Sequence, residues 1–559
     1  MDRRLYHRLW AGLSGFLLIA CLFVGLGAIG LLGPDEPRYA SIARTMAQTG
    51  DWVTPRLWGH PWFEKPILFY WAAAASFKLF GVSEGAARLP NALAALAGAL
   101  LLALAAWRLW GGREARLALV IFPTSIGIFA FARAATMDML LAVSLEAAMV
   151  AALFVLSLEE PPARSWRRHE RKLDPRVPRA LVGACIGLGT LAKGPVAIIL
   201  AGGSVLLWAA LTGRWRDAMR FLRWEPVAAF AVVALPWYIA CSLANPDFAR
   251  SFLWHQNVQR FLTPVFEHVQ PWWFFFPILA LGLVPWTPAL VATARDIWRV
   301  FWSGQAKESP EVFVACWAIF PLLFFSFSKS KLPGYILPAL PPLILLLART
   351  ISGIPSRRTA ATTQPDESGE TKARTDPVGL AAIGLVGIGW VALAASAGHW
   401  LRRLPPNWGA HHHADIVMAL GATALVGLAI AALAVLRRPR MAVALSALWM
   451  GLLVAGVGFE VLPRLDPLVS ARAMAESIVY VGPPRTPVEQ YHLQRDWTYG
   501  LNYYFGHELP EWSTADPQTV CVYTTWEGLA TIERSNSVIE AVLPLHGQLL
   551  IARVSPPRR

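Results

Sequence analysis

The 559-residue chain is 55% hydrophobic and 15% charged, against roughly 45–50% and about 25% in ordinary soluble domains. Its apolar residues come in long blocks, which excludes an ordinary soluble protein and indicates a chain that crosses a membrane repeatedly. The formal net charge of +14 is concentrated in loops that set membrane orientation, so nucleic acid is not expected as a partner.

The first apolar block, residues 9–33, carries no charge and exceeds the roughly 20 helical residues that a bilayer requires. Its apolar core is longer than that of a signal peptide, so an uncleaved first helix is expected. With this helix, the sequence predicts about thirteen spans. The other twelve are 90–110, 116–132, 137–157, 180–192, 194–211, 225–242, 273–293, 310–327, 334–350, 378–398, 415–436 and 441–460.

Basic segments predict the orientation of these spans. Four of them fall on one side, which we assign to the cytoplasm: the N-terminus and the segments 159–180, 212–224 and 436–441. Arg402 and Arg403 are an exception on the other side. The predicted organisation is a membrane domain over 1–463, with an external loop at 34–89 and a flexible cytoplasmic linker at 353–377, followed by a small external α/β domain over 464–559.

The external loop 34–89 contains two features of interest. Asp35 and Glu36 precede Pro37, a residue favoured in the first turn of a helix, so a carboxylate pair is expected at a helix start. By itself this pattern is most simply an N-terminal cap. The apolar run 67–81 is too short to span and is flanked by aromatic residues, which favours short helices lying along the membrane surface.

Further polar side chains are expected on the same face of the membrane. Cations and a phenol can neutralise a leaving phosphate, a carboxylate can act as a base, and Glu with His can hold a metal, so the set is typical of chemistry on a lipid-linked phosphate. Taken singly, each has an ordinary structural explanation, such as a loop hydrogen bond, an interfacial anchor or an ion pair. The set comprises Glu64, Lys65, Arg133, Asp138, Lys193, His255, Arg260, Lys329, Lys331 and Tyr335.

Six motifs carry a resemblance to a known family: "DEPRYA" (35–40), "FEKP" (63–66), "ARAATMDM" (132–139), "LAKGP" (191–195), "HQNVQR" (255–260) and "KLPGYILP" (331–338). In this order they resemble the polyprenyl-phosphate-sugar-dependent membrane glycosyltransferases of the lipid A aminoarabinose transferase (ArnT) type, which are related to protein O-mannosyltransferases. The likeness covers residues 10 to 350 well and the remainder only by layout.

The resemblance implies an all-α multi-pass membrane protein of the GT-C fold in the bacterial inner membrane, with its active site facing the periplasm. It implies Asp35 as the catalytic carboxylate and Asp138 as a second catalytic carboxylate that supports the loop, with Arg38 or Arg133 as its partner and Glu36 also in support. It implies a divalent metal, with zinc favoured, at Glu64 and His255. The carrier phosphate is then expected at Lys65, Arg260, Tyr335 and Lys193.

The implied reaction moves a sugar from a polyprenyl-phosphate donor to lipid A or another envelope glycolipid with inversion, and membrane lipids surround the enzyme. A protein acceptor, as in the mannosyltransferases, stays open as an alternative. A transporter or flippase of lipid-linked sugars is a second alternative, although such proteins usually show internal repeats and polar groups near the bilayer midplane. The phosphate-handling residues do not identify the sugar.

Overall fold

The computed structural model describes residues 3–159, 174–259, 270–304, 306–353, 376–401, 413–481, 483, 486–514, 518–545 and 547–556. The chain forms two compact units, each considered by itself. The first comprises Met1–Phe23, Ala92–Ala132 and Met137–Val454, and the second comprises Val24–Asn91, Arg133–Thr136 and Ala455–Arg559. Nearly all of the predicted linker 353–377 lies outside the described residues.

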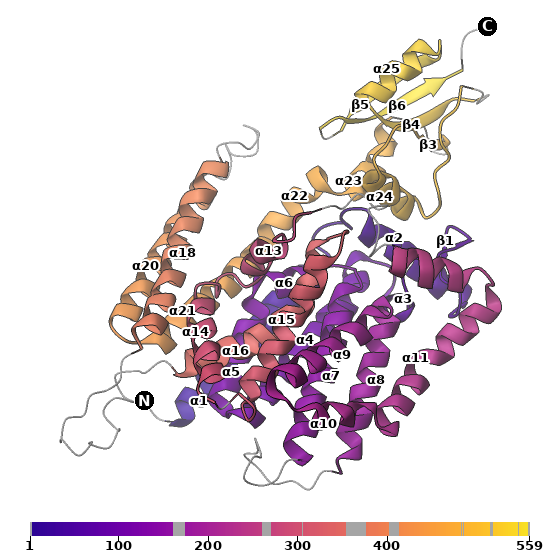
Figure 1. Cartoon of the computed structure of the whole chain (residues 1–559). Helices are drawn as coiled ribbons and strands as arrows, with labels where there is room; N and C mark the ends of the chain where they lie inside the picture. Colours follow the sequence, from indigo (N-terminus) through magenta and orange to yellow (C-terminus); the bar gives the residue numbers. More distant parts are fainter. Residues whose placement is uncertain are drawn as a thin grey trace, which may run out of the picture. The chain divides into compact units, whose positions relative to one another are not determined.

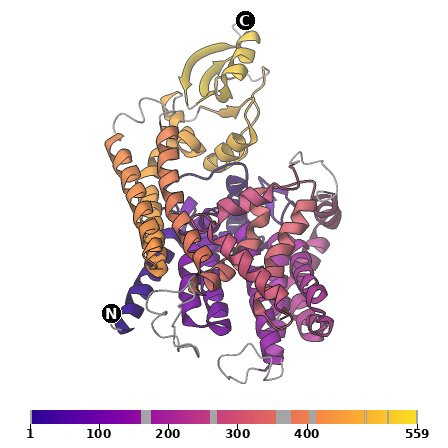
Figure 2. The same ribbon diagram turned by 60° about the vertical axis from the view of Figure 1, so that its left-hand side comes forward.

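The first unit is a helical bundle (Figure 1). Figures 1 and 2 show α18 and α20 side by side as an antiparallel pair. The helices are α1 (Arg3–Leu22), most of α4 (Glu84–Leu109), α5 (Gly112–Thr124), α6 (Ile126–Ala132), α7 (Asp138–Glu159), α8 (Arg176–Lys193), α9 (Val196–Thr212), α10 (Trp215–Ala218), α11 (Trp224–Ala244), α13 (Phe275–Gly282), α14 (Ala289–Trp302), α15 (Pro310–Phe327), α16 (Leu340–Gly353), α18 (Pro377–Leu401), α20 (His413–Val435) and most of α21 (Pro439–Gly456). Short 3-10 or π segments are η2 (Met219–Leu222), η3 (Arg250–Gln259) and η4 (Pro333–Ala339).

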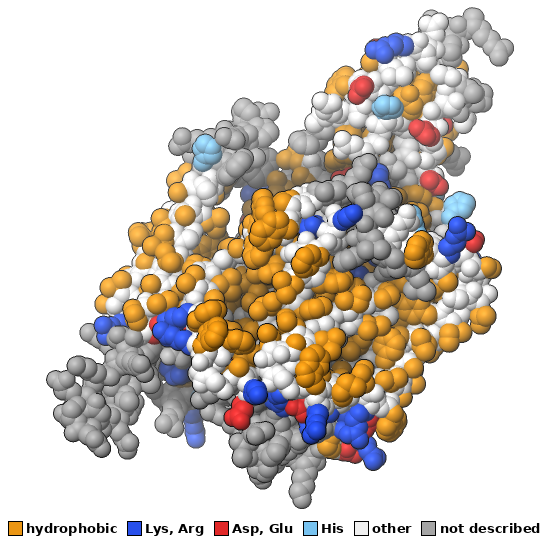
Figure 3. Space-filling view, in the orientation of Figure 1, with side chains coloured by type: hydrophobic (Ala, Val, Ile, Leu, Met, Phe, Trp, Pro, Cys, Tyr) orange, Lys and Arg blue, Asp and Glu red, His pale blue; other side chains and the backbone are white. Residues whose placement is uncertain are grey.

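Nine of the described helices are long and apolar enough to cross a membrane, or ten if α5 and α6, which meet at a bend of 63°, form one crossing. The sequence predicted about thirteen spans. The class, an all-α multi-pass membrane protein, is confirmed, whereas the number of spans stays a prediction. Figure 3 shows apolar side chains spread over the visible face of the bundle, as a helix surface in contact with lipid requires.

Besides 116–132, which is bent between α5 and α6, two of the predicted spans are wrong as single helices. The block 9–33 forms a helix only to Leu22, since Gly25 takes a left-handed backbone (φ 72°) and lies against Gly458, where a Cβ would come within 2.9 Å of the carbonyl oxygen. The block 273–293 divides into α13 and α14, because Pro285 and Pro288 lack the backbone N–H that a continuous helix needs.

The second unit contains the predicted external loop and the C-terminal region. The loop forms α2 (Asp35–Thr49), a two-stranded hairpin of β1 (Arg56–Leu57) and β2 (His60–Pro61), and α3 (Leu68–Phe80), so its two short helices are confirmed. The C-terminal region contains η5 (Val457–Val461), α22 (Leu462–Val469), α23 (Ala471–Glu476), η6 (Ser477–Tyr480), β3 (Val488–Gln490), α24 (Arg495–Phe505), β4 (Val520–Thr525), α25 (Trp526–Arg534), β5 (Val538–Pro544) and β6 (Leu549–Ser555).

The C-terminal strands form one sheet in the order β3-β4-β6-β5. β3 pairs with β4 in parallel, and the other two pairings are antiparallel. In the sequence, the runs 488–493, 519–524 and 548–554 favour strands and overlap β3, β4 and β6, and the run 525–535 favours a helix and contains α25. β5 and α24 were not predicted. Apolar residues alternate poorly in β5, whose burial pattern is mostly exposed, so it lacks the periodicity that marks a half-buried strand.

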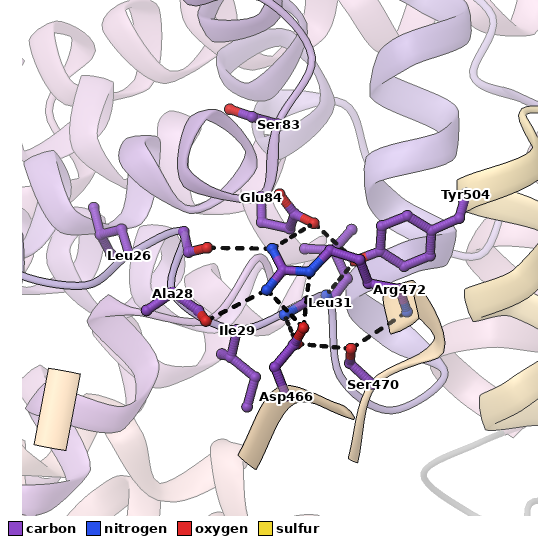
Figure 4. A network of polar contacts seen from close by, with 12 residues as sticks. Leu26, Ala28, Ile29, Leu31, Ser83, Glu84, Asp466, Ser470, Arg472 and Tyr504 are labelled. Carbon is purple, nitrogen blue, oxygen red and sulfur yellow. Dashed lines mark hydrogen bonds and ion pairs between the residues drawn. The ribbon is translucent and has the colours of Figure 1, made fainter. Parts of the chain in front are cut away.

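A polar network holds the C-terminal region to the segment that precedes α2 (Figure 4). Asp466 accepts hydrogen bonds from the Gly30 amide (2.6 Å) and the Ser470 hydroxyl (2.7 Å), and it pairs with Arg472 (2.7 Å). Arg472 also pairs with Glu84 (3.3 Å), which accepts from the Tyr504 hydroxyl (3.0 Å). The second unit is therefore assembled from both ends of the chain.

Candidate active site

The start of α2 presents an exposed carboxylate. Gly33 has a left-handed backbone (φ 63°) that redirects the chain, and the helix begins at Asp35 without a side-chain cap hydrogen bond at Pro34. The side chain of Asp35 is 49% exposed, so its carboxylate is accessible to a ligand. Pro34 takes the N-cap position, and Asp35 lies in the first turn, where a negative charge interacts favourably with the helix dipole.

Arg38 links the predicted site residues of this loop. Its guanidinium is 4% exposed and contacts Asp35 through Nη2 and Oδ1, and it binds Glu64 through Nη1 and Oε2 at 2.9 Å. The other oxygen of Glu64 lies 3.6 Å from the ammonium of Lys65. Burial lowers the pKa of Arg38, but Tyr39, Glu64 and Asp35 more than offset this effect and raise it above its usual value. Arg38 therefore stays charged and orders two carboxylates.

Aromatic rings enclose the same guanidinium. Its central carbon lies 5.0 Å from the ring centre of Tyr39, 5.9 Å from that of Trp62 and 5.4 Å from that of Tyr499. Tyr499 belongs to α24 and stacks on Trp58, with ring centres 5.5 Å apart. Cation–π contacts of this kind stabilise a buried cation. A residue of the C-terminal region thus contributes directly to the environment of Arg38.

Glu36 has a structural role. Its carboxylate is 7% exposed and forms two hydrogen bonds with Arg88, at 2.9 and 2.7 Å. It also accepts from the amides of Leu32 (2.8 Å) and Ala135 (2.7 Å). Glu36 therefore fixes the entry to α2 and the segment 133–136, which contains the half-buried side chain of Arg133. The supporting role predicted for Glu36 has a geometric basis.

A second cluster lies within the first unit, at Asp138, Lys193 and Tyr335. α8 ends at Lys193 because Gly194 takes a left-handed backbone (φ 91°) and Pro195 starts the next helix. The ammonium of Lys193 pairs with Oδ1 of Asp138, the first residue of α7, and lies 4.8 Å from the ring centre of Tyr335. Lys193 is a partner for Asp138 that the sequence analysis did not foresee, having named Arg38 or Arg133.

The positions of the other predicted residues are only partly described. His255 is exposed in η3, and its Nδ1 lies 2.7 Å from Oε1 of Gln259. Lys331 donates to the carbonyl oxygen of Gln270 at 3.1 Å and contacts that of Ser328. Arg260, predicted to bind the carrier phosphate, lies outside the described residues.

No group of three or more His, Cys, Asp or Glu side chains among the described residues is placed to hold a metal ion. Both carboxylate oxygens of Glu64 face cations, which does not favour a metal ion in the same place. The metal predicted at Glu64 and His255 therefore stays a prediction, and no step of the chemistry below depends on it.

Comparisons with known proteins identify the family. The model of the dolichyl-phosphate-mannose-protein mannosyltransferase family matches residues 28–252. An undecaprenyl phosphate-alpha-4-amino-4-deoxy-L-arabinose arabinosyl transferase of Edwardsiella ictaluri is 32% identical over 74% of this chain and 72% of its own. The corresponding protein of Pseudomonas aeruginosa is 34% identical over 59% of this chain and 57% of its own.

The chain belongs to the family of undecaprenyl phosphate-alpha-4-amino-4-deoxy-L-arabinose arabinosyl transferases, which are membrane glycosyltransferases. The crystal structure of ArnT from Cupriavidus metallidurans bound to undecaprenyl phosphate shares its fold, with a TM-score of 0.76 and 23% identity over 99% of this chain and 98% of that one. The apo form of the same protein matches with a TM-score of 0.74. The predicted membrane glycosyltransferase of the GT-C fold is therefore confirmed and is favoured over both alternatives.

Sequence reasoning missed several residues that surround Glu36 and Arg38. Arg88 gave a usable signal, because it is a charged residue at the start of an otherwise apolar helix. Trp58 has a positive φ of 49°, which the sequence did not indicate. Tyr499 carried no signal, since its partner Arg38 lies at the opposite end of the chain.

We expect Tyr499→Leu to lower kcat/KM for sugar transfer by about 3- to 30-fold, because it removes a ring from the Arg38 guanidinium and frees Trp58. Tyr499→Phe retains the ring and should keep most of the activity. Tyr480→Leu is the matched control, as its side chain is 81% exposed in the same region. Equal rates for Tyr499→Leu and Tyr480→Leu would show that the ring has no part in the site.

Proposed function

We propose that this glycosyltransferase transfers a sugar from a polyprenyl phosphate, undecaprenyl phosphate in the first instance, to lipid A or another envelope glycolipid. The proposed sugar is 4-amino-4-deoxy-L-arabinose, because the names of the relatives contain this sugar. The observation that carries the proposal is the exposed carboxylate of Asp35, held by a buried arginine next to Lys65. Such an arrangement suits a reaction in which an acceptor oxygen attacks a sugar and a phosphate leaves.

In the proposed reaction an acceptor oxygen attacks the anomeric carbon, and the bond from that carbon to the carrier phosphate breaks. The sugar is transferred with inversion, and the electron pair leaves with the phosphate. Asp35 takes the proton of a hydroxyl acceptor, or orients an acceptor that is already an ionised phosphate. Arg38 holds Asp35 in place from the buried side.

The cations stabilise the charge that develops on the leaving phosphate. Lys65, Lys193 and Arg260 supply positive charge, and Tyr335 supplies a hydroxyl donor. Lys193 is held by Asp138, so its ammonium is positioned before the substrate arrives. Asp138 is in this proposal a positioning residue for Lys193 rather than a base.

The decisive experiment incubates purified protein with undecaprenyl-phosphate-linked aminoarabinose and lipid A, and analyses the lipid A by mass spectrometry. We expect one sugar added per acceptor and free undecaprenyl phosphate in equal amount. Modified protein in place of modified lipid A would instead favour the protein acceptor. Movement of the donor across vesicles without any glycosylated product would contradict the proposed enzyme.

The proposed location is the bacterial inner membrane, with Asp35 facing the periplasm. The basic segments support it, because they are predicted to lie together on the cytoplasmic side. A reporter active only outside the cytoplasm and fused after residue 480 should be active, and the same reporter within 353–377 should be silent. The reverse pattern would place Asp35 in the wrong compartment.

A divalent metal, with zinc favoured, at Glu64 and His255 is a separate proposal. It requires Glu64 to leave its ion pairs with Arg38 and Lys65, since both carboxylate oxygens are occupied by them. Glu64→Gln and His255→Ala should each lower the zinc content of purified protein if the metal is bound there. Unchanged zinc in both variants would leave Glu64 as a partner of Arg38 alone.

A further inference from the structure

The first unit contains a large apolar cavity among α7, α8, α9, α11 and the connection α10–η2. Its volume is about 350 Å³, within the roughly 300–1,000 Å³ of ligand pockets. None of the predicted active-site residues lines it. The side chains that line its walls include those of Met149, Ile186, Val205, Phe221 and Phe230. These walls offer almost no hydrogen-bond partners, so they suit an apolar occupant.

The connection between α9 and α11 forms one edge of this cavity. Trp215, Met219 and Leu222 line it and are themselves 52%, 59% and 67% exposed, so the cavity opens at this edge. Trp224, at the start of α11, is 69% exposed. Exposed tryptophans at a helix end are typical of the level of the lipid headgroups.

Cations alternate with these apolar side chains. The segment 214–223 contains four arginines and one aspartate, Asp217, which pairs with Arg214 (2.5 Å) and Arg220 (3.0 Å). Arg216 and Arg223 are exposed beside the exposed Trp215 and Leu222. Figure 3 shows Lys and Arg side chains, with Asp and Glu side chains among them, at the end of the bundle where α10 lies. The apolar cavity thus opens beside a segment that carries more positive than negative side chains.

We propose that this cavity binds one acyl chain of an anionic diacyl phospholipid, whose headgroup phosphate contacts Arg216 and Arg223. The apolar walls supply the binding surface for the chain, and the arginines select a negative headgroup over a zwitterionic one. On the predicted topology this lipid belongs to the cytoplasmic leaflet. The site is independent of the proposed sugar transfer.

Glycine 202 offers a way to fill the cavity without disturbing the fold. It is an exposed residue of α9 that lines the cavity, and a Cβ added there would meet nothing within 4 Å. A leucine side chain at this position would therefore occupy space reserved for the acyl chain. Gly183, which also lines the cavity, is unsuitable because a Cβ there would come within 1.8 Å of the Pro226 carbonyl oxygen.

The test measures lipid retention by the full-length protein in detergent with native mass spectrometry. The probes are phosphatidylglycerol and phosphatidylcholine with the same acyl chains. We expect one phosphatidylglycerol to be retained more strongly than phosphatidylcholine. Gly202→Leu should weaken retention of both lipids. The double variant with Arg216→Glu and Arg223→Glu should reduce the preference for phosphatidylglycerol over phosphatidylcholine by about tenfold.

Matched controls carry the same substitutions elsewhere. Gly421→Leu lies on α20 at another exposed glycine whose added Cβ meets nothing within 4 Å. Arg8→Glu with Arg438→Glu changes the charge equally at two other exposed arginines. Both controls should bind phosphatidylglycerol as the parent protein does. Thermal unfolding of every variant shows that a loss of lipid is not a loss of fold.

Two results would overturn the proposal. One is phosphatidylglycerol retention that is unchanged in both Gly202→Leu and the double arginine variant. The other is complete displacement of phosphatidylglycerol by equimolar polyprenyl phosphate, since the cavity would then hold the tail of the sugar carrier.

Discussion

Asp35→Asn should lower sugar transfer by roughly 100- to 10,000-fold, the range typical of a lost general acid or base. The side chain keeps its shape and loses its charge. Because Asp35 is 49% exposed and Arg38 retains Glu64 and three aromatic rings, the fold should be little affected. The measurement is kcat with a saturating polyprenyl-phosphate donor, together with thermal unfolding of the same preparation.

Asp51→Asn is the control for this result. It is the same change in the same loop, at a carboxylate that accepts from the amides of Val53 (3.1 Å) and Thr54 (3.0 Å) and pairs loosely with Arg56 (3.5 Å). It should leave transfer nearly unchanged. Near-normal transfer by Asp35→Asn would mean that the carboxylate only holds Arg38, and the proposed reaction would lose its base.

Arg88→Ala should have the largest effect on stability, about 3–5 kcal/mol in the free energy of unfolding. The guanidinium is 3% exposed, and its loss leaves the carboxylate of Glu36 buried without its cation. It also removes hydrogen bonds to the carbonyl oxygens of Leu26 (2.8 Å), Ile29 (2.7 Å) and Gly30 (2.7 Å). The shift in the thermal unfolding midpoint of purified protein measures the loss.

Arg56→Ala provides the comparison, because its ion pair with Asp51 is more than one-third exposed on both sides and should contribute at most about 1 kcal/mol. Glu36→Gln should lower the free energy of unfolding less in the Arg88→Ala variant than in the parent protein. In that variant the carboxylate of Glu36 has already lost its cation. If Arg88→Ala and Arg56→Ala unfold at the same temperature, Arg88 does not hold the loop as described.

Local features were predictable because they depend on neighbouring residues. The pattern Asp-Glu-Pro at 35–37 indicated a helix start, and α2 begins at Asp35. Apolar blocks long enough to cross a bilayer indicated the class of protein, and short apolar runs indicated β4 and β6. Where the prediction failed, at 9–33 and 273–293, hydrophobicity alone was followed although glycine and proline end the helices.

The partners of the site residues were decided by the tertiary structure. The contact of Asp35 with Arg38 is local, an i,i+3 pair within α2, whereas the pair of Arg38 with Glu64 requires the segment after β2 to pack against α2. In the same way Lys193 reaches Asp138 because α7 and α8 pack together.

The sequence by itself determined that this protein is a multi-pass membrane glycosyltransferase and which residues carry charge in the segments predicted to be external, since composition, helix length and motifs are local properties of the chain. Only the tertiary structure decided that Glu36 is neutralised by Arg88 and that Tyr499 covers Arg38. The physical reason is that a buried charge requires a partner, and which distant segment supplies that partner depends on how the whole chain packs.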